Sequence, residues 1–337
     1  MKLELFPFQL RFKHAFKIAH GIRITTDVVY VRLSHENMVG WGGATLPPYL
    51  PETQETVVDF LKGVDLSAVH VPFNPLMVFK WLNETYPGNY AAKAALDMAL
   101  WDLKAQMENR TVGQLLGLRV PLMPLCTYTL GVSSFEEMKR KVFEAEEDGF
   151  ELFKIKLNGI NDLESVENLR RLTHKPFAVD VNQGWHTVAE ARANIRAILP
   201  YEPVLIEQPL PVGDEAGMQQ LRKEFLIPFY ADESCQTQEQ LEELADYFDG
   251  VNIKLMKCGG ISPAVEMIDR AKELGMSVLI GCMSESSVGC TAAAHLAPLA
   301  DYVDLDGPYL IANDPFKGMT IEEGRVKVNR LVQLVEM

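Results

Sequence analysis

Ala178-Val179-Asp180-Val181-Asn182 is a short apolar run that carries an acid at its end, and four similar runs occur nearby. In each run the charged residue follows the previous one by about 25 residues, close to the length of one strand and one helix. The other four runs are Phe153-Lys154-Ile155-Lys156, Leu205-Ile206-Glu207-Gln208-Pro209, Tyr230-Ala231-Asp232-Glu233-Ser234 and Val251-Asn252-Ile253-Lys254. This spacing predicts parallel strands whose charged residues lie at the same end.

Further strand patterns precede and follow these five runs, at 125–130, 277–282 and 302–306. Amphipathic stretches such as 134–148 and 262–275 lie between strands and predict helical connections. Eight strands with helical crossovers favour a closed α/β barrel of the TIM type over an open sheet. The chain has no Gly-rich phosphate-binding motif, so the sequence does not support nucleotide binding.

The sequence before the barrel has a different pattern. We expect residues 1–120 to form an α+β capping domain, residues 121–310 the barrel, and residues 311–337 a segment that returns to the capping domain. The capping domain is predicted to contain strands at 2–12 and 27–34, a third strand ending at 40–43, and a helix at 91–103. The connections at 14–26 and 46–54 are expected to lack regular structure, and 325–328 looks like a strand.

Composition excludes several classes of partner. The formal charge of −14 would repel a nucleic-acid backbone or an anionic membrane surface. No apolar run is long enough for a membrane helix or a signal peptide. The five cysteines form no Cys-x-x-Cys pair, so buried thiols in a reducing compartment are expected. We therefore expect a cytoplasmic protein that binds neither nucleic acid nor membrane.

Asp180, Glu207 and Asp232 are predicted to meet at the carboxyl ends of three adjacent strands. Mg²⁺ prefers oxygen ligands, so three carboxylates there would suit this cation. Each acid alone could equally be the N-cap of the following helix. The matched positions of all three, without a competing histidine or cysteine cluster, favour a Mg²⁺ site and disfavour zinc.

Lysines flank these acids on either side. Lys154 and Lys156 alternate along one strand and therefore face the same side, whereas Lys254 ends a strand across the barrel. Lysine is usually a solvated surface residue, and that alternative applies to each of them. Beside a dication and a second ammonium, however, the pKa of a lysine falls and the amine can act as a base. Two such lysines suit removal of a proton from one face of a carbon and its return from the other.

These motifs, with Asp180-Val181-Asn182-Gln183-Gly184-Trp185 and the helix at 91–103, resemble the enolase superfamily, in its muconate-lactonizing-enzyme subgroup. The resemblance covers nearly the whole chain and implies a modified (β/α)7β TIM barrel with a capping domain and bound Mg²⁺. It also implies that Lys156 and Lys254 are the acid/base residues and that Lys154 lies by the substrate carboxylate. Lys257 is a neighbouring alternative, but Lys254 follows Asn252-Ile253 as the family pattern requires.

The subgroup includes cycloisomerases, o-succinylbenzoate synthases, N-acylamino-acid racemases and dipeptide epimerases. Asp304-Leu305-Asp306 resembles the signature with which dipeptide epimerases bind the free α-ammonium group of the substrate. The alternative is a pair of solvated acids at a strand end. The resemblance further implies that the backbone and carboxylate of the dipeptide are bound by Thr129, Cys282, Met283 and Ser284.

The resemblance favours an L-Ala-D/L-Glu epimerase of murein-peptide recycling, acting by two-base 1,1-proton transfer through an ene-diolate. Relatives that act on Ala-Glu tend to carry an arginine for the glutamate at the position of Gly21. Arg23 is expected to replace it, and the alternative is a different side-chain specificity. An N-acylamino-acid racemase or o-succinylbenzoate synthase is the alternative enzyme, and a non-catalytic peptide-binding relative is the alternative class. The sequence does not determine the oligomeric state, and a homo-oligomer is one of the alternatives.

Overall fold

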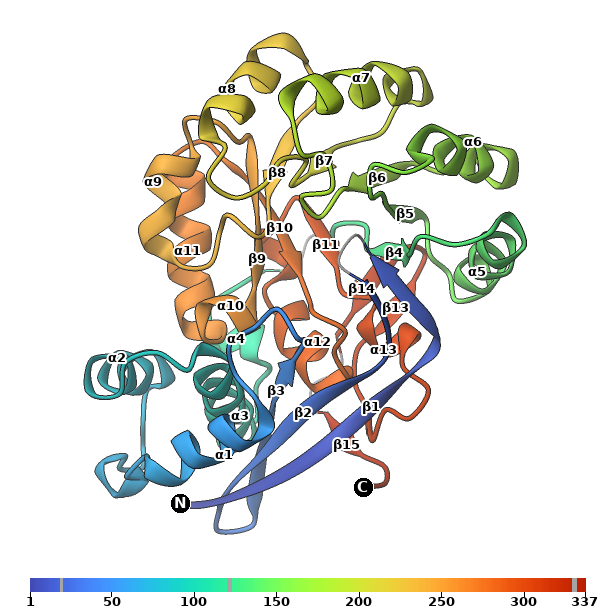
Figure 1. Cartoon of the computed structure of the whole chain (residues 1–337). Coiled ribbons are helices and arrows are strands. Elements are labelled where there is room, and N and C mark those ends of the chain that lie inside the picture. Colours follow the sequence, from blue (N-terminus) through green and yellow to red (C-terminus); the bar gives the residue numbers. More distant parts are fainter. Residues whose placement is uncertain (19–20, 120–122, 329–331) are drawn as a thin grey trace.

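A parallel barrel forms the larger part of the molecule, and its strands are ordered as they occur in the chain (Figure 1). The computed structural model describes residues 1–18, 21–119, 123–328 and 332–337. The barrel strands are β4 (Thr127–Leu130), β5 (Leu152–Lys156), β6 (Phe177–Asp180), β7 (Ile206–Glu207), β8 (Phe229–Ala231), β9 (Gly250–Lys254), β10 (Ser277–Gly281) and β11 (Tyr302–Asp304). A bridge between Cys126 and Val303 connects the first strand to the last, so the sheet nearly closes on itself.

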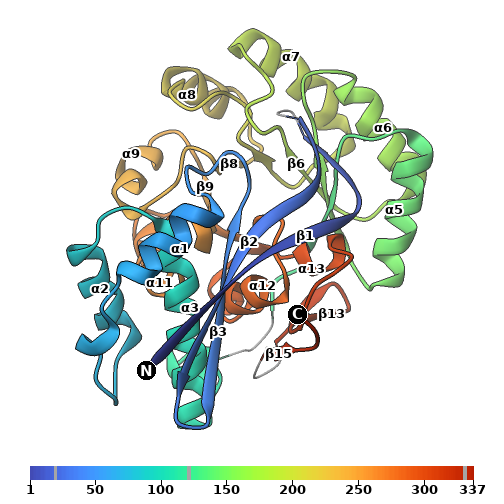
Figure 2. The ribbon, with the colours of Figure 1, turned by 60° about the horizontal axis from the view of Figure 1, so that its bottom comes forward.

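Helices cover the outside of the barrel, and they include the two amphipathic stretches predicted at 134–148 and 262–275 (Figures 1 and 2). The side chains of Ser134 and Thr187 cap two of them by accepting hydrogen bonds from backbone N–H groups three residues later. These helices are α5 (Phe135–Glu147), α6 (Asp162–Leu172), α7 (Val188–Ile198), α8 (Glu215–Glu224), α9 (Leu241–Leu244), α10 (Leu255–Cys258), α11 (Ile261–Glu273), α12 (Ser287–Ala294) and α13 (Gly307–Leu310). Among the described residues, no helix has the length and apolar character needed to cross a membrane.

The N-terminal region contains a separate antiparallel sheet of β1 (Lys2–Ile18), β2 (Gly21–His35) and β3 (Met38–Leu46). The prediction of an unstructured connection at 14–26 is wrong. β1 continues to Ile18 and β2 begins at Gly21, while residues 19 and 20 lie outside the described residues. The β-branched residues at 22 and 24–26 favour a strand, and pairing with β1 supplies the backbone hydrogen bonds that a strand requires. The hairpin extends from the first helices to the barrel strands (Figure 2).

Helices of the N-terminal region pack against this sheet, and the predicted helix at 91–103 is confirmed as part of α3. Gly42 on β3 allows close packing here, because a Cβ atom at Gly42 would lie 1.9 Å from the carbonyl oxygen of Ala95 on α3. The connection predicted at 46–54 contains neither helix nor strand between Leu46 and Gln54. The helices are α1 (Gln54–Gly63), α2 (Pro75–Thr85), α3 (Tyr90–Glu108) and α4 (Val112–Leu115).

The segment after the barrel contacts both parts of the molecule. Ile311 forms a bridge with Phe12 on β1, and the ring of Phe316 packs 4.9 Å from that of Tyr30 on β2. The hairpin of β13 (Thr320–Glu322) and β14 (Arg325–Lys327) instead contacts the barrel, where Gly324 accepts a hydrogen bond from Cys126 N–H. The pair β12 (Phe316–Lys317) and β15 (Gln333–Leu334) completes the chain. The predicted domain division at residue 120 lies outside the described residues and stays a prediction.

Candidate active site

The carboxyl ends of the barrel strands border a cavity of about 330 Å³, to which the N-terminal region also contributes. Most of the predicted site residues line this cavity: Arg23, Thr129, Lys156, Asp232, Lys254, Cys282, Met283, Ser284, Asp304 and Asp306. The remaining three, Lys154, Asp180 and Glu207, are almost completely buried and contact the others through ion pairs. The structure therefore brings all of the predicted site residues together.

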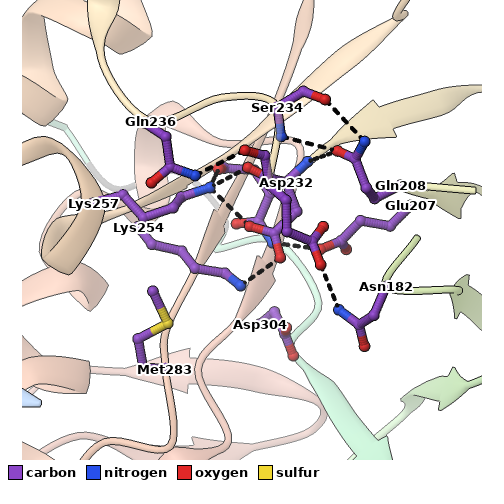
Figure 3. Close-up of polar contacts among 12 residues, drawn as sticks. Asn182, Glu207, Gln208, Asp232, Ser234, Gln236, Lys254, Lys257, Met283 and Asp304 are labelled. Carbon is purple, nitrogen blue, oxygen red and sulfur yellow. Dashed lines mark hydrogen bonds and ion pairs between the residues drawn. The ribbon is translucent and has the colours of Figure 1, made fainter. Parts of the chain in front are cut away.

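Asp180, Glu207 and Asp232 form one cluster, with a carboxylate oxygen from each lying within 4.8 Å of the others. Asp180 and Glu207 end β6 and β7 and are paired in register, and Asp232 follows β8 directly. Figure 3 shows Glu207 and Asp232 side by side. The parallel register of adjacent strands thus places acids that are far apart in sequence at one point in space.

This cluster fits a hard dication. Burial raises the pKa of Glu207 to about 8, and the nearby Asp180 carboxylate adds to the effect. Three carboxylates buried so closely are unfavourable unless positive charge neutralises them. All of the donors are carboxylate oxygens, the ligands that Mg²⁺ prefers, and no histidine or cysteine of the described residues belongs to the cluster.

Lys154 on β5 lies at the centre of these charges. Its Nζ is 3.0 Å from Asp180 Oδ2, 2.9 Å from Glu207 Oε2 and 2.7 Å from Asp304 Oδ2. Burial disfavours the ammonium, but the Asp180, Asp304 and Glu207 carboxylates outweigh it and hold the pKa of Lys154 well above its ordinary value. Lys154 therefore stays protonated and supplies a fixed positive charge.

Lys156 and Lys254 line the cavity from two strands, β5 and β9, with the three acid-bearing strands between them. Lys156 Nζ lies 2.5 Å from Asp180 Oδ2, and Lys254 Nζ lies 2.7 Å from Asp232 Oδ2. Burial disfavours the charge of Lys254, yet Asp232 raises its pKa above the ordinary value. The lowered pKa expected from the sequence therefore requires a dication on the same carboxylates, which would cancel their effect on the amine.

Lys257 was the alternative to Lys254 as the acid/base residue on this side of the cavity. Its contacts differ from those of Lys254. Its Nζ donates to the backbone oxygen of Asp232 and to Asp232 Oδ1, both at 2.7 Å, and to the backbone oxygen of Asn252 at 2.9 Å. An ammonium has three N–H groups, so these bonds use all of them. The geometry assigns Lys257 to holding Asp232 and leaves Lys254 as the better candidate for proton transfer.

The two aspartates of the Asp304-Leu305-Asp306 motif are not equivalent. The strand predicted at 302–306 ends earlier, since β11 ends at Asp304 and Asp306 is the N-cap of α13. Asp304 accepts hydrogen bonds from Thr127, Thr129 and Lys154. Asp306 Oδ2 accepts a hydrogen bond of 2.6 Å from Thr129 N–H. Asp304 is therefore engaged by several protein donors, including an ammonium, whereas Asp306 is held mainly by Thr129.

The protonation of the two acids differs as well. Burial opposes the charge of Asp304, but Lys154 outweighs it and lowers the pKa of Asp304 below its ordinary range. Burial raises the pKa of Asp306 to about 7, and the neighbouring Asp304 carboxylate contributes in the same direction. The charge of Asp304 is thus already offset by Lys154, whereas a cation that entered the cavity would favour the ionised form of Asp306.

Arg23, on β2, reaches the cavity from the N-terminal sheet. Its Nη2 donates to Ser284 Oγ at 3.3 Å. Its guanidinium lies 5.7 Å from the ring centre of Phe12 and 5.8 Å from that of Tyr49, distances typical of cation–π contacts. Tyr49 also donates a hydrogen bond to Met283 Sδ at 3.1 Å. Arg23 is thus placed by aromatic side chains as well as by a barrel loop.

Several cavity residues were not identified from the sequence, namely Tyr49, Asn182, Gln183, Glu233 and Gln236. Asn182, Gln183 and Glu233 lie one to three residues after a predicted metal ligand, so their position in the motifs was an available signal. Tyr49 lies in a proline-rich connection whose pattern carries no such signal. Its role depends on a contact with a loop more than two hundred residues away.

Comparison with known proteins agrees with this geometry. A family model described as "Mandelate racemase / muconate lactonizing enzyme, N-terminal domain" matches residues 3–117. A second model, described as "Enolase C-terminal domain-like", matches residues 137–330.

Individual relatives cover almost all of the chain. The L-Ala-D/L-Glu epimerase of Bacteroides thetaiotaomicron is 38% identical and covers 98% of this chain and 86% of its own. The dipeptide epimerase of Cytophaga hutchinsonii was solved with Mg and the dipeptide D-Ala-L-Val. Its structure has a TM-score of 0.90 at 26% identity, and the match covers 98% of this chain and 95% of that one. The N-succinyl Arg/Lys racemase of Bacillus cereus has a TM-score of 0.89 at 27% identity, and the match covers 98% of this chain and 94% of that one.

Proposed function

Because the chain belongs to the mandelate racemase and muconate lactonizing enzyme branch of the enolase superfamily, we propose that it is a magnesium-dependent dipeptide epimerase. The observation that carries the proposal is the pair Lys156 and Lys254, which line one cavity from two sides of the carboxylate cluster. Two bases on opposite faces of one carbon are what inversion by proton transfer requires.

In the proposed reaction one lysine, as the neutral amine, takes the proton from the α-carbon of the dipeptide's C-terminal residue. The electron pair of the broken C–H bond moves into the adjacent carboxylate and gives an ene-diolate. The second lysine, as the ammonium, donates its proton to the opposite face of the same carbon, where the electron pair forms the new C–H bond. The configuration is inverted without any net change in protons or electrons.

The developing charge of the ene-diolate must be offset. Asp180, Glu207 and Asp232 would hold the dication, which supplies positive charge beside the reacting carboxylate when it is bound. Lys154 adds a second positive charge, because its surrounding acids keep it protonated. Charges that are in place before the reaction stabilise its transition state without further reorganisation.

We propose that the remaining residues bind the dipeptide. The free ammonium group of the substrate would lie at Asp304 and Asp306, and its backbone and carboxylate would contact Thr129 and the 282–284 turn. The turn residues are Cys282, Met283 and Ser284. Arg23 would bind a carboxylate on the substrate side chain, which makes L-Ala-D/L-Glu the leading substrate. Murein-peptide recycling in the cytoplasm is the setting we propose for such a substrate.

An N-acylamino-acid racemase is the alternative enzyme, favoured by the similarity to the N-succinyl Arg/Lys racemase. An o-succinylbenzoate synthase, the other alternative, would use the same proton-abstracting residues. The substrates of these two alternative enzymes are anions without a free ammonium group. The buried acids Asp304 and Asp306 at the cavity would disfavour their binding. Asp304 and Asp306 therefore support the dipeptide over both alternatives.

Proton exchange in D₂O tests the proposal directly. We expect ¹H NMR to show loss of the α-proton signal of L-Ala-L-Glu together with appearance of the other diastereomer, with Mg²⁺ present but not with EDTA. A small panel of other dipeptides would rank the side-chain preference. Exchange on N-acylamino acids but on no dipeptide would replace the proposal with the racemase. Absence of exchange on every substrate would favour a non-catalytic relative.

A further inference from the structure

Gln208 follows Glu207 at the end of β7, and its side chain has no exposed surface. Its Oε1 accepts hydrogen bonds from the backbone N–H groups of Asp232 at 3.0 Å and Ser234 at 3.1 Å. Its Nε2 donates to Ser234 Oγ at 2.9 Å and to the backbone oxygen of Leu210 at 3.1 Å. Figure 3 shows this side chain beside Ser234 and Asp232. A primary amide offers two donors and two acceptor positions, so all of them are used.

The backbone of Gln208 is fixed in the same way. Its N–H donates to the carbonyl oxygen of Tyr230 on β8, and its carbonyl oxygen accepts from Gln183 N–H. Its φ of 38° lies in the left-handed region, which is uncommon for a residue other than glycine. Such conformations persist where surrounding contacts determine them and are frequent at functional sites.

These bonds connect the two loops that carry Glu207 and Asp232. Gln208 is adjacent to Glu207 in the chain and accepts a hydrogen bond from Asp232 N–H, so its amide joins the segments that carry the two carboxylates. All four side-chain hydrogen bonds of Gln208 are made to other groups of the protein. A lysine at this position would compete with a cation, and a carboxylate would add negative charge beside Glu207 and Asp232. A neutral amide avoids both effects.

We propose that Gln208 is a positioning residue that sets the spacing of Glu207 and Asp232 and thereby the affinity of the carboxylate cluster for Mg²⁺. This inference rests on the proposed function, since it presumes that the cluster binds Mg²⁺. It differs from a role in stability alone, because the amide is bonded to the backbone of one proposed ligand and adjoins another.

Isothermal titration of the metal-free, full-length protein with Mg²⁺ tests the inference. Gln208→Met keeps the length of the side chain and removes all four hydrogen bonds. We expect Mg²⁺ binding about 10- to 100-fold weaker, the usual effect of losing a group that orients a metal ligand. Gln219→Met, on the exposed surface of α8, is the matched control and should bind Mg²⁺ as the unaltered protein does.

Two further readouts separate positioning from stability. Hydrogen exchange in EDTA should show protection of the Asp232 and Ser234 amides in the unaltered protein and faster exchange in Gln208→Met. Saturating Mg²⁺ should restore most of the turnover rate of Gln208→Met, because Lys156 and Lys254 are unchanged. A lower melting temperature in EDTA with an unchanged dissociation constant for Mg²⁺ would overturn the inference.

Ser234→Ala provides a second variant in case Gln208→Met does not fold. It removes one acceptor of Gln208 Nε2 and keeps the two bonds to Gln208 Oε1. We expect Mg²⁺ affinity to fall between about twofold and tenfold, as for the loss of one hydrogen bond. Unchanged affinity would count against the inference. If the unaltered protein itself binds no Mg²⁺, the proposed function fails first, and that result is distinct from an effect of Gln208.

Discussion

Individual side chains in this cavity have separate tasks that their contacts define. Lys154 is surrounded by carboxylates and keeps its charge, whereas Lys156 and Lys254 line the space where a substrate would lie. Lys257 uses its three N–H groups to hold Asp232. Four lysines of the same chemistry are thus separated by their contacts into three positions.

The two-base mechanism predicts opposite stereochemical behaviour in two variants. Lys156→Ala and Lys254→Ala should each reduce epimerisation of L-Ala-L-Glu by about 10²- to 10⁴-fold, the usual contribution of a general base. Each variant should still exchange the α-proton of one diastereomer in D₂O, and the two variants should exchange different diastereomers. Lys223→Ala, on the exposed surface of α8, should retain full activity. Exchange of the same diastereomer by both variants would exclude two opposing bases.

The different contacts of Asp304 and Asp306 predict different kinetic effects. Asp306→Asn should raise KM for free dipeptides by about 10- to 100-fold, since a hydrogen bond to a charged group is lost. Asp304→Asn should lower kcat, because Lys154 loses one of the carboxylates that hold it. Steady-state kinetics on L-Ala-L-Glu and on its N-acetyl derivative would separate the two effects. Equal changes in KM with unchanged kcat in both variants would show that the two acids act alike.

Secondary-structure elements connect the N-terminal region to the barrel through a small buried network. On α3, Asp97 accepts hydrogen bonds from Ser262 Oγ at 2.6 Å and from Ser262 N–H at 2.9 Å. Trp101, one turn later, donates to the same Ser262 Oγ at 2.9 Å. Burial raises the pKa of Asp97 to about 7, although the bonds to Ser262 act in the opposite direction. This acid therefore couples the packing of α3 on α11 to pH.

The sign of this coupling follows from the two states of the chain. The pKa of Asp97 is about 7 when folded, against an ordinary value of 3.8. Protonated Asp97 thus stabilises the folded state fully below pH 3.8, and this contribution is lost as the pH rises through 7. The contribution is about 4 kcal/mol, since one pKa unit corresponds to about 1.4 kcal/mol.

Urea unfolding between pH 4 and 8 would measure the effect. The stability of the unaltered protein should fall relative to that of Asp97→Asn as the pH rises, because asparagine does not ionise. Asp59→Asn, on the exposed surface of α1, should follow the unaltered protein at every pH. A constant stability difference between the unaltered protein and Asp97→Asn across this range would contradict the assignment.

At the scale of the whole molecule, the cavity exists only because two regions meet. The barrel supplies the carboxylates and lysines, and the N-terminal region supplies Arg23 and Tyr49. The contacts from Arg23 to Ser284 and from Tyr49 to Met283 join these regions at a single barrel loop. Under the proposed function, the barrel would supply the proton-transfer residues and the N-terminal region the contact to the substrate side chain.

This division predicts that Arg23 affects substrate choice rather than proton transfer. Arg23→Met should lower kcat/KM for L-Ala-L-Glu by about 10- to 100-fold, as expected for losing a charge-assisted hydrogen bond. Turnover of L-Ala-L-Leu should change little, since it has no side-chain carboxylate. Arg11→Met is a control on the same hairpin, because Arg11 is exposed. Equal losses on both dipeptides would indicate a structural role for Arg23.

The sequence by itself determined the barrel, the carboxylate cluster and the lysines, because the spacing of charged strand ends reports a local repeat that parallel packing must preserve. It predicted strands within β1 and β2 but not their extension through 14–26, and it did not determine the place of Tyr49, the different contacts of Asp304 and Asp306, or the bonds of Gln208. Those features depend on contacts between residues far apart in the chain, such as Tyr49 with Met283 and Thr129 with Asp306. Only the tertiary structure brings such groups within hydrogen-bonding distance, and no local pattern of residues encodes that distance.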